Sequence, residues 1–459
     1  MLTGDNMNRK DILLNITLVF LLILTIIQAS LLWIKFPNLK EHKNTQEVYN
    51  TFDFFKEILK PEKIVLNAGN SNHYVEYTFP DIWNDYVDVL SSIFLKTHEE
   101  NMIPVNIMEY LKAQREKSIV FVFNKETNGR LFLNLTGDNR NSKNKYNLEI
   151  KEIYLSSKSI FISNSKGIFK LNYKVDVNPE ELIDKLDYSN LTPYINLYEA
   201  YGIKNNIYIP KDGKIKYQEI YYQDEIQNLN KVYENNLASR VLNQNIDYIK
   251  EITQNDGTTF VNGDKFLKIL NAGLIYYENP ELIENTEENL YLSLKTAVVF
   301  MSSKMGVPNT IKMYKYEPLN DKNIGNGYRF YFNFTQDNIP VCLDSNIASN
   351  YIIIDVYSDF IRSYRQIYRS AVEKPEKIYH ESKKTDIFTL VNDNYNIFNI
   401  NNENPTVEEI LKSLQNVDIC YIDINKNDEK SKLIPALKIE YNNRNLFFNL
   451  KNGYFIMER

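Results

Sequence analysis

PEKIVLNAGNSNHYVEYTFPDIWNDYVDVL, residues 61–90, carries the clearest fold signal in the chain. It reads as a strand, a turn, a second strand and a helix. The helix places its apolar side chains on one face, which is the pattern of a helix that covers a sheet. These apolar residues are Trp83, Tyr86, Val87, Leu90 and Phe94. A sheet with a covering helix predicts the α+β class for the folded part of the chain.

Strand signals continue along the same part of the sequence. Residues 118–123 and 130–135 alternate like two strands around a turn that ends in Asn128-Gly129. Residues 159–163 and 168–174 read as two more strands. We place these elements in an N-terminal α+β domain, residues 48–215.

The later chain contains a weak internal repeat, whose first copy we assign to a central α+β domain, residues 216–375. Two strands (266–270 and 274–277) precede the tripeptide Glu278-Asn279-Pro280. A helix follows, with Leu290, Leu294, Ala297 and Met301 on one face. Three strands then close the unit, at 311–316, 328–334 and 339–343.

The second copy has the same order and is assigned to a C-terminal α+β domain, residues 376–459. Its strands are 387–391 and 395–398, and Glu403-Asn404-Pro405 follows. Thr406 and Glu409 fit a capping box at the start of a helix that carries Val407, Ile410, Leu411 and Leu414. Three strands end the unit, at 419–424, 436–441 and 446–450. Both copies therefore predict a ββαβββ unit, an antiparallel sheet with one covering helix.

The segment that joins the two copies, residues 357–372, is rich in arginine and tyrosine. It reads as a strand end or as a helix. Arg362, Arg365 and Arg369 form a basic stripe if it is helical, and the alternative is a solvated or salt-bridged connector.

The N-terminal region contains a long apolar segment, ILLNITLVFLLILTIIQASLLWI, residues 12–34. It has no charged residue, and as a helix it spans about 34 Å, which is enough to cross a bilayer. A cleaved signal peptide is the alternative, but its apolar core is shorter and ends in a small-residue cleavage site. We expect a cytoplasmic tail (1–11), a transmembrane helix (12–34) and a stalk (35–47), with the body outside the cell membrane.

The orientation of this span depends on the size of the body. Arg9 and Lys10 precede the span and Lys35, Lys40 and Lys43 follow it, so flanking charge does not select an orientation. A short N-terminal tail normally stays inside. Polar and small residues of the span fall near one stripe, which suits contact with a partner helix in lipid. They are Asn15, Thr25, Gln28 and Ala29.

Composition excludes several function classes. The net charge of -6 gives no basic footprint for nucleic acid. Cys342 and Cys420 form no CxxC pair, which argues against a zinc or redox motif and leaves two lone thiols or one disulfide. No two of the four histidines stand three or four residues apart, and no GxSxG, phosphate-binding or metalloprotease motif occurs. A Ser-x-x-Lys at Ser163 and Lys166 lies in a strand-turn context and lacks the partner motif that a serine-lysine hydrolase needs. We therefore expect no catalytic residues, no metal and no cofactor, and a binding or regulatory role.

Three stretches resemble a known family. They are residues 61–83, with Pro61, Asn67 and Trp83; residues 256–280, which end in Tyr276-Tyr277-Glu278-Asn279-Pro280; and residues 433–456, with Pro435 and Asn452-Gly453. With the N-terminal span they resemble the YycH regulatory proteins of Gram-positive bacteria, and the last module also resembles the related YycI proteins. Leu437 departs from the pattern, which has a tryptophan two residues after the proline.

The resemblance implies a protein anchored by one helix, with its body outside the membrane. It implies association with the sensor histidine kinase of a two-component system that controls cell-wall metabolism, and with a YycI-like membrane protein. The contact is expected to run largely through transmembrane helices, and the resemblance supplies no catalytic residue. The alternative is a surface-tethered protein of the cell envelope that binds wall polymer or another protein and is unrelated to kinase signalling.

Overall fold

Strand β1 (Lys63–Gly69) shows how the sequence of the body builds two hydrophobic cores. Successive side chains of a strand point to opposite faces of its sheet. Ile64 and Leu66 accordingly lie in one core, together with Trp83, while Val65 lies in a second core with Tyr77. All five residues are buried, so the apolar run of β1 is explained by a strand that is covered on both faces.

The computed structural model describes residues 18, 21, 51–97, 99–133, 148–172, 178–189, 191–224, 229–281, 289–307, 310–321, 324–344, 348, 350–372, 378–382, 386–399, 404–424 and 430–459. Contacts divide the chain into two units, Met1–Val48 and Tyr49–Arg459. Of the predicted span, only Leu18 and Leu21 are described, and both are helical. Among all the described residues, no helix is both long and apolar enough to cross a membrane.

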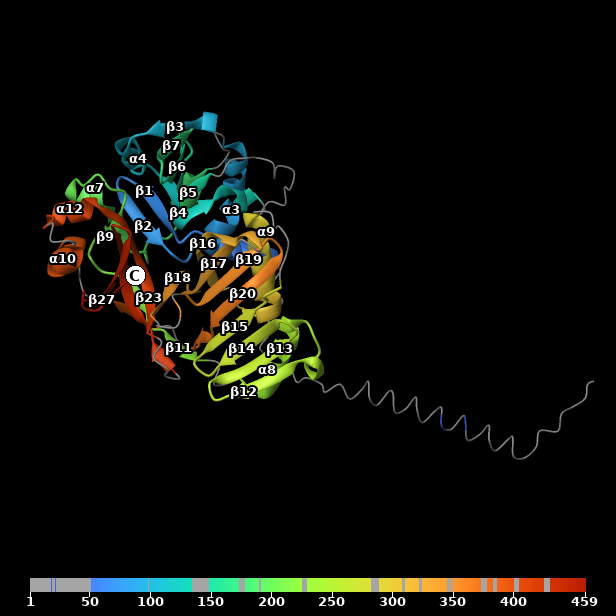
Figure 1. The fold of residues 1–459 in the computed structure, drawn as a ribbon. Coiled ribbons are helices and arrows are strands. Elements are labelled where there is room, and N and C mark those ends of the chain that lie inside the picture. Colours follow the sequence, from blue (N-terminus) through green and yellow to red (C-terminus); the bar gives the residue numbers. More distant parts are fainter. Residues whose placement is uncertain are drawn as a thin grey trace, which may run out of the picture. The chain divides into compact units, whose positions relative to one another are not determined.

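The N-terminal part of the body is a nine-stranded antiparallel sheet (Figure 1). Its strands, in spatial order, are β3 (Met102–Val105), β7 (Gly167–Leu171), β6 (Ile160–Asn164), β5 (Glu149–Leu155), β4 (Ser118–Asn128), β1, β2 (Asn72–Glu76), β8 (Pro193–Asn196) and β9 (Tyr208–Pro210). Helix α6 (Pro179–Lys185) contacts β1 and β4, and α3 (Pro80–Lys96) contacts α5 (Gly129–Leu133).

A 13-stranded sheet forms most of the rest. In order it contains β12 (Lys250–Gln254), β13 (Gly257–Asn262), β14 (Lys265–Leu270), β15 (Leu274–Glu278), β20 (Phe360–Ile367), β19 (Ile352–Tyr357), β17 (Gly325–Gln336), β18 (Ile339–Asp344), β23 (Leu414–Ile424), β25 (Ile434–Tyr441), β26 (Arg444–Asn449) and β27 (Phe455–Glu458), with β16 (Ile311–Asp321) paired to β17. Its pairs are antiparallel except β18 with β23, which are parallel and join the central strands to the C-terminal ones.

Helices cover this sheet at several places. Helix α8 (Lys231–Leu242) contacts β13 and β14, and α9 (Leu290–Val299) contacts β17, β19 and β20 (Figure 1). A π-helical segment, Phe300–Met305, continues α9. The other helices are α2 (Thr51–Ile58), α4 (Ile107–Ala113), α7 (Leu197–Tyr201), α10 (Ile387–Asp393), α11 (Tyr395–Phe398) and α12 (Val407–Lys412), and 3-10 turns lie at Glu99–Asn101 and Ile246–Tyr248.

Two small sheets pair segments that are distant in sequence. One pairs β10 (Lys216–Gln218) with β22 (Tyr379–Glu381). The other places β11 (Tyr221–Asp224) between β21 (Arg369–Ala371) and β24 (Lys430–Lys432). The domain limits expected at residues 215 and 375 stay predictions.

The α+β class, helix α3 and the first ββαβββ unit are confirmed. Strands β14 and β15, helix α9 and strands β16, β17 and β18 follow one another in the predicted order. The capping box is also confirmed, because the Thr406 side chain accepts from the backbone N–H of Glu409 and the Glu409 side chain accepts from that of Thr406.

Three expectations about local structure are wrong. The predicted strands at 387–391 and 395–398 are helices α10 and α11, so the second copy is not a ββαβββ unit. Asp386 caps α10 by accepting from the Thr389 N–H, and a short apolar run alone does not distinguish a buried helix from a strand. The predicted strand at 130–135 begins as helix α5, whose Phe132 packs edge-on against Trp83.

Candidate functional site

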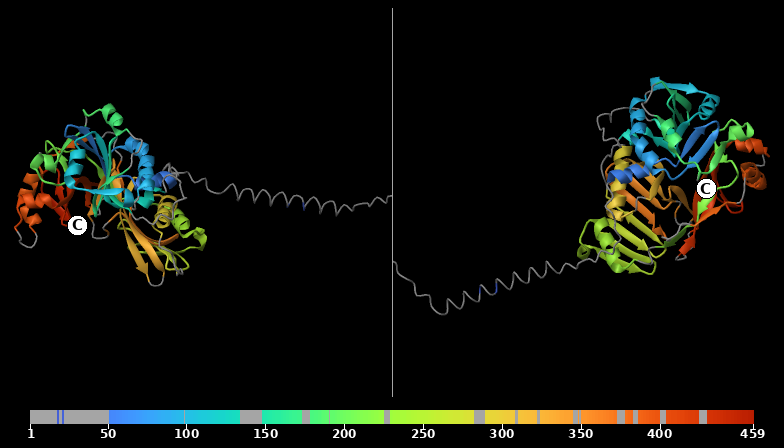
Figure 2. Two further views of the ribbon diagram at one scale, coloured as in Figure 1. Left: turned by 90° about the horizontal axis from the view of Figure 1, so that it is seen from above. Right: turned by 180° about the vertical axis from the view of Figure 1, so that it is seen from behind.

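A buried ion pair joins the two large sheets. The Lys63 ammonium at the start of β1 contacts the Asp418 carboxylate on β23, and both side chains are more than nine-tenths buried. Lys63 Nζ also donates to the Val417 carbonyl at 3.1 Å and to Asn416 Oδ1 at 3.3 Å. In the view from behind in Figure 2, the blue N-terminal strands accordingly lie next to the red C-terminal strands. We call this group of contacts the junction.

Tyr77 and Asn338 extend the junction on either side of the ion pair. The Tyr77 hydroxyl accepts from the Ile419 N–H at 3.2 Å and donates to Asp418 at 3.4 Å. Asn338 Nδ2 donates to the Tyr77 carbonyl at 2.6 Å and to the Glu62 carbonyl at 3.3 Å. Asn338 has a positive φ of 64° in the two-residue turn between β17 and β18, a conformation that asparagine tolerates well.

Lys312 of β16 is the second buried lysine of the junction. Its ammonium donates to the Pro61 carbonyl at 2.6 Å and to Asn338 Oδ1 at 3.1 Å, and both acceptors are neutral. Burial lowers the pKa of Lys312 to about 7, although Glu62 acts in the opposite direction.

Glu62 is the unusual member of the junction. Its side chain is buried, and its Oε2 atom has no hydrogen-bond partner. Burial and then the Asp418 charge raise the pKa of Glu62 to about 7, while Lys438, Lys312 and Lys63 oppose the rise. For Lys438, burial acts to lower the pKa, but Glu62 and other neighbours raise it above its ordinary value. Glu62 therefore changes protonation near neutral pH.

A second buried ion pair lies further along β23. Arg369 Nε donates to Asp423 Oδ2 at 2.8 Å, and the Tyr351 hydroxyl donates to the same oxygen at 2.7 Å. Arg369 and the other two arginines of the 357–372 segment do not form a helical stripe, because this segment is strands β20 and β21. Arg362 instead bonds the Asn279 carbonyl at 2.8 Å, and the Arg365 guanidinium lies 5.2 Å from the Tyr276 ring centre. Of the alternatives for this segment, a helical basic stripe or a solvated or salt-bridged connector, the salt-bridged connector is therefore correct at Arg369.

Next to the junction is a cavity of about 420 Å³. It is lined by the end of α2, by Glu62, by β4 and by one stretch of β16. The lining residues are Ile58, Leu59, Lys60, Glu62, Phe123, Thr127, Glu149, Lys312, Met313, Tyr314, Lys315, Tyr316 and Pro318. A volume of this size lies within the range of small-molecule sites, about 300–1,000 Å³.

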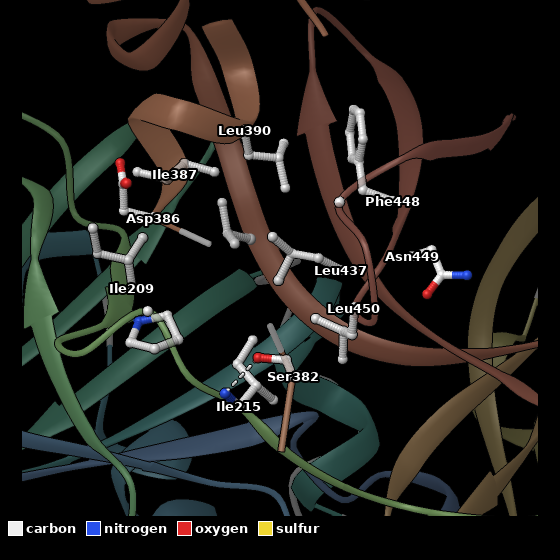
Figure 3. Close-up of a pocket in the computed structure, with 14 residues that line it drawn as sticks. Ile209, Ile215, Ser382, Asp386, Ile387, Leu390, Leu437, Phe448, Asn449 and Leu450 are labelled. Carbon is white, nitrogen blue, oxygen red and sulfur yellow. Dashed lines mark hydrogen bonds between the residues drawn. The ribbon is translucent and has the colours of Figure 1, made fainter. Parts of the chain in front are cut away.

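A second, much smaller cavity lies between the C-terminal elements and the segment 209–215 at the end of β9 (Figure 3). Its volume is about 20 Å³, which is room for roughly one water molecule. Leu390, Leu437 and Phe448 surround it, and the Ser382 hydroxyl accepts from the Ile215 N–H at 2.9 Å. We interpret it as a packing defect of the core.

The residues predicted for a partner helix, Asn15, Thr25, Gln28 and Ala29, lie outside the described part of the chain, and that contact stays a prediction. The two cysteines are buried free thiols in one small cluster with Ile422. Within the described ranges, no three histidine, cysteine or acidic side chains are placed to hold a metal ion.

No residue of the junction is among those that the sequence predicted to be functional. A usable signal was present: Asp418 and Lys438 each interrupt an apolar strand pattern, where a charged residue needs a partner. Which residues become partners cannot be read from that signal, because Lys63 and Asp418 are 355 positions apart.

Comparison with solved structures finds a fold similar to that of YycH from Bacillus subtilis, with a TM-score of 0.53 over 87% of this chain and 98% of that one, at 11% identity. The chain has a YycH-like fold. The resemblance to YycH is thereby confirmed for the fold. Other matches are an uncharacterized protein from Eubacterium rectale (TM-score 0.35, 14% identity, 55% of this chain and 90% of that one) and the YpeB C-terminal domain of Bacillus megaterium (TM-score 0.27, 10% identity, 50% and 97%). No protein-family model matches the sequence, and no curated protein matches it.

Proposed function

We propose that this chain is a membrane-anchored regulator that binds a sensor histidine kinase of a two-component system controlling cell-wall metabolism. The observation that carries the proposal is the YycH-like fold, which extends over 87% of this chain. The apolar segment 12–34 supports the membrane anchor, with the N-terminus in the cytoplasm and the body outside the membrane. By the same resemblance, a YycI-like membrane protein is a second partner, and the chain is not an enzyme.

The junction supports a mechanism in which the body acts as a rigid unit. Lys63, Tyr77 and Asn338 tie the nine-stranded sheet to strands of the 13-stranded sheet through buried bonds. A kinase that alternates between two signalling states is biased by any partner that contacts one state better than the other. A body that keeps one shape provides such a difference when its surface contacts one signalling state of the kinase better than the other.

The experiment is a bacterial two-hybrid assay between the full chain and the sensor kinase from the same genome. We expect association, and its absence would contradict the proposed function. The triple variant Thr25→Leu, Gln28→Leu, Ala29→Leu tests the helix contact, and we expect weaker association. The matched control replaces Phe20, Ile23 and Ile27 on the opposite helix face with leucine. Equal association of both variants would refute the helix contact and leave the body as the binding surface.

The alternative, a tethered envelope protein unrelated to kinase signalling, has the 420 Å³ cavity in its favour. Sedimentation of the full chain with isolated cell wall distinguishes the two functions. Binding to wall together with no kinase association would favour the alternative.

A further inference from the structure

The cavity beside the junction has the construction of a ligand site. Its volume of about 420 Å³ is far larger than the roughly 10–15 Å³ that holds one water molecule. Its walls come from separate parts of the fold: the end of α2, Glu62, strand β4, the first residue of β5 and strand β16. Pro318 and Glu149 are exposed while Glu62 and Lys312 are buried, so the cavity leads from the surface to the junction.

Glu62 indicates the hydrogen-bonding character of the ligand. An ionised carboxylate only accepts hydrogen bonds, and buried acceptors in folded proteins are nearly always satisfied. Glu62 lines the cavity, and its Oε2 has no donor. A ligand hydroxyl completes this site in either protonation state of Glu62, because it can donate to the carboxylate and accept from the carboxylic acid.

The charges around the cavity favour a neutral ligand. The lining contains three lysines and two carboxylates. Lys60 has its own counter-charge in Glu57 at 3.4 Å, and Lys315 has one in Glu317. The Lys312 ammonium repels a cationic ligand that binds at Glu62, and the Glu62 carboxylate repels an anionic ligand. Neither sign of charge is favoured over a neutral donor.

The remaining wall favours a ligand with an apolar face. Aromatic and aliphatic surface comes from Phe123, Met313, Tyr314, Tyr316 and Pro318. Flat apolar walls with a few polar groups bind ring compounds in a fixed orientation. A sugar ring combines these properties, because its C–H groups pack on aromatic side chains and its hydroxyls donate hydrogen bonds.

We propose that this cavity binds a small neutral ring ligand with several hydroxyl groups, of the monosaccharide class, and that one ligand hydroxyl donates to Glu62. The proposal does not depend on the kinase partnership. Binding reaches the junction directly, because the Glu62 carbonyl accepts from Asn338 and Lys63 is the next residue.

The test is saturation-transfer NMR on the full chain, in micelles of a detergent that has no sugar headgroup. The probes are glucose, glucosamine and glucuronate at equal concentration and neutral pH, because they share one ring and differ in charge. We expect the strongest transfer to glucose. Stronger transfer to glucosamine or glucuronate would overturn the assignment of a neutral ligand, and transfer to none of the three would overturn the site.

Two variants and one control variant test whether glucose binds in this cavity. Glu62→Gln weakens the acceptor while keeping its size, and we expect roughly tenfold weaker glucose binding, because bonds to charged groups are about twice as strong as neutral ones. Pro318→Trp adds bulk at an exposed position of the lining, and we expect it to block binding without disturbing the junction. The control is Glu181→Gln, which changes an exposed carboxylate of α6 that does not line the cavity. Transfer that persists in both Glu62→Gln and Pro318→Trp places the sugar elsewhere and refutes the proposal.

Discussion

Replacing Lys63 with methionine tests whether the junction holds the two large sheets together. Methionine keeps the apolar stem of the lysine but leaves the Asp418 carboxylate, whose side chain is 1% exposed, without its main counter-charge. Removing one member of a buried ion pair costs about 3–5 kcal/mol. Asp418 keeps its bonds from Asn416 and Tyr77, so we expect the lower end of that range, about 3 kcal/mol. That is a large share of the roughly 5–15 kcal/mol by which folded proteins are stable.

The assay is urea unfolding of the full chain, followed by tryptophan fluorescence and by circular dichroism. The sequence has two tryptophans, so a Trp33→Phe background leaves the fully buried Trp83 as the only fluorescent probe of this kind. The matched control is Lys117→Met, which breaks an ion pair to Asp184 whose side chains are 39% and 59% exposed, and which we expect to cost less than about 1 kcal/mol.

The double variant Lys63→Met, Asp418→Leu removes both charges, and we expect it to be more stable than Lys63→Met alone. Equal stability losses for Lys63→Met and Lys117→Met would refute our interpretation of the junction. A double variant less stable than the single one would show that Asp418 acts mainly through its other partners.

Three further predictions concern other parts of the chain. The pKa of Glu62 rises from 4.5 to about 7 on folding, so the folded state binds more protons in that window and stability falls as the pH rises through it. The pKa of Lys312 falls from 10.5 to about 7 on folding, so the unfolded state binds more protons between these values and stability rises from pH 7 toward 10.5. When urea midpoints are measured from pH 5 to 10, we expect Glu62→Gln to lose the fall in stability below pH 7 and Lys312→Met to lose the rise above pH 7. Midpoints that depend on pH as in the parent chain would contradict these pKa directions. Cys342 and Cys420 should resist an aromatic disulfide reagent in the native chain and release two equivalents in urea, whereas no release would reveal a disulfide. Thr406→Ala should lower the free energy of unfolding by about 1 kcal/mol through loss of the capping box, and a threonine-to-serine variant that retains the hydroxyl should be close to the parent.

Local signals in the sequence predicted much of the fold. The apolar stripe with Trp83 identified α3, and Thr406 with Glu409 identified the start of α12, because each pattern reports contacts within a few residues. The same local reasoning failed at residues 387–391, where an apolar run fits both a strand and a helix. Asp386 was the available signal, since it occupies the helix N-cap.

The site could not be predicted in the same way. Lys63 and Asp418 meet because the parallel pairing of β18 with β23 carries the C-terminal strands back to β1, and nothing near either residue encodes that pairing. The cavity likewise depends on the approach of α2 to β16. A charge within an apolar strand pattern needs a partner when it is buried, but the tertiary fold fixes which residue that partner is.

The separation of Lys63 from Asp418 also has a consequence for biosynthesis. At about 5–20 residues per second, roughly 20–70 s pass between the synthesis of Lys63 and that of Asp418, which is 355 positions later. During this interval β1 and its neighbours have no C-terminal cover, and Val65 and Tyr77 lack part of their second core. A chain that stops before β23 therefore leaves this face of the nine-stranded sheet covered only by α4, α7 and the segment that follows α7.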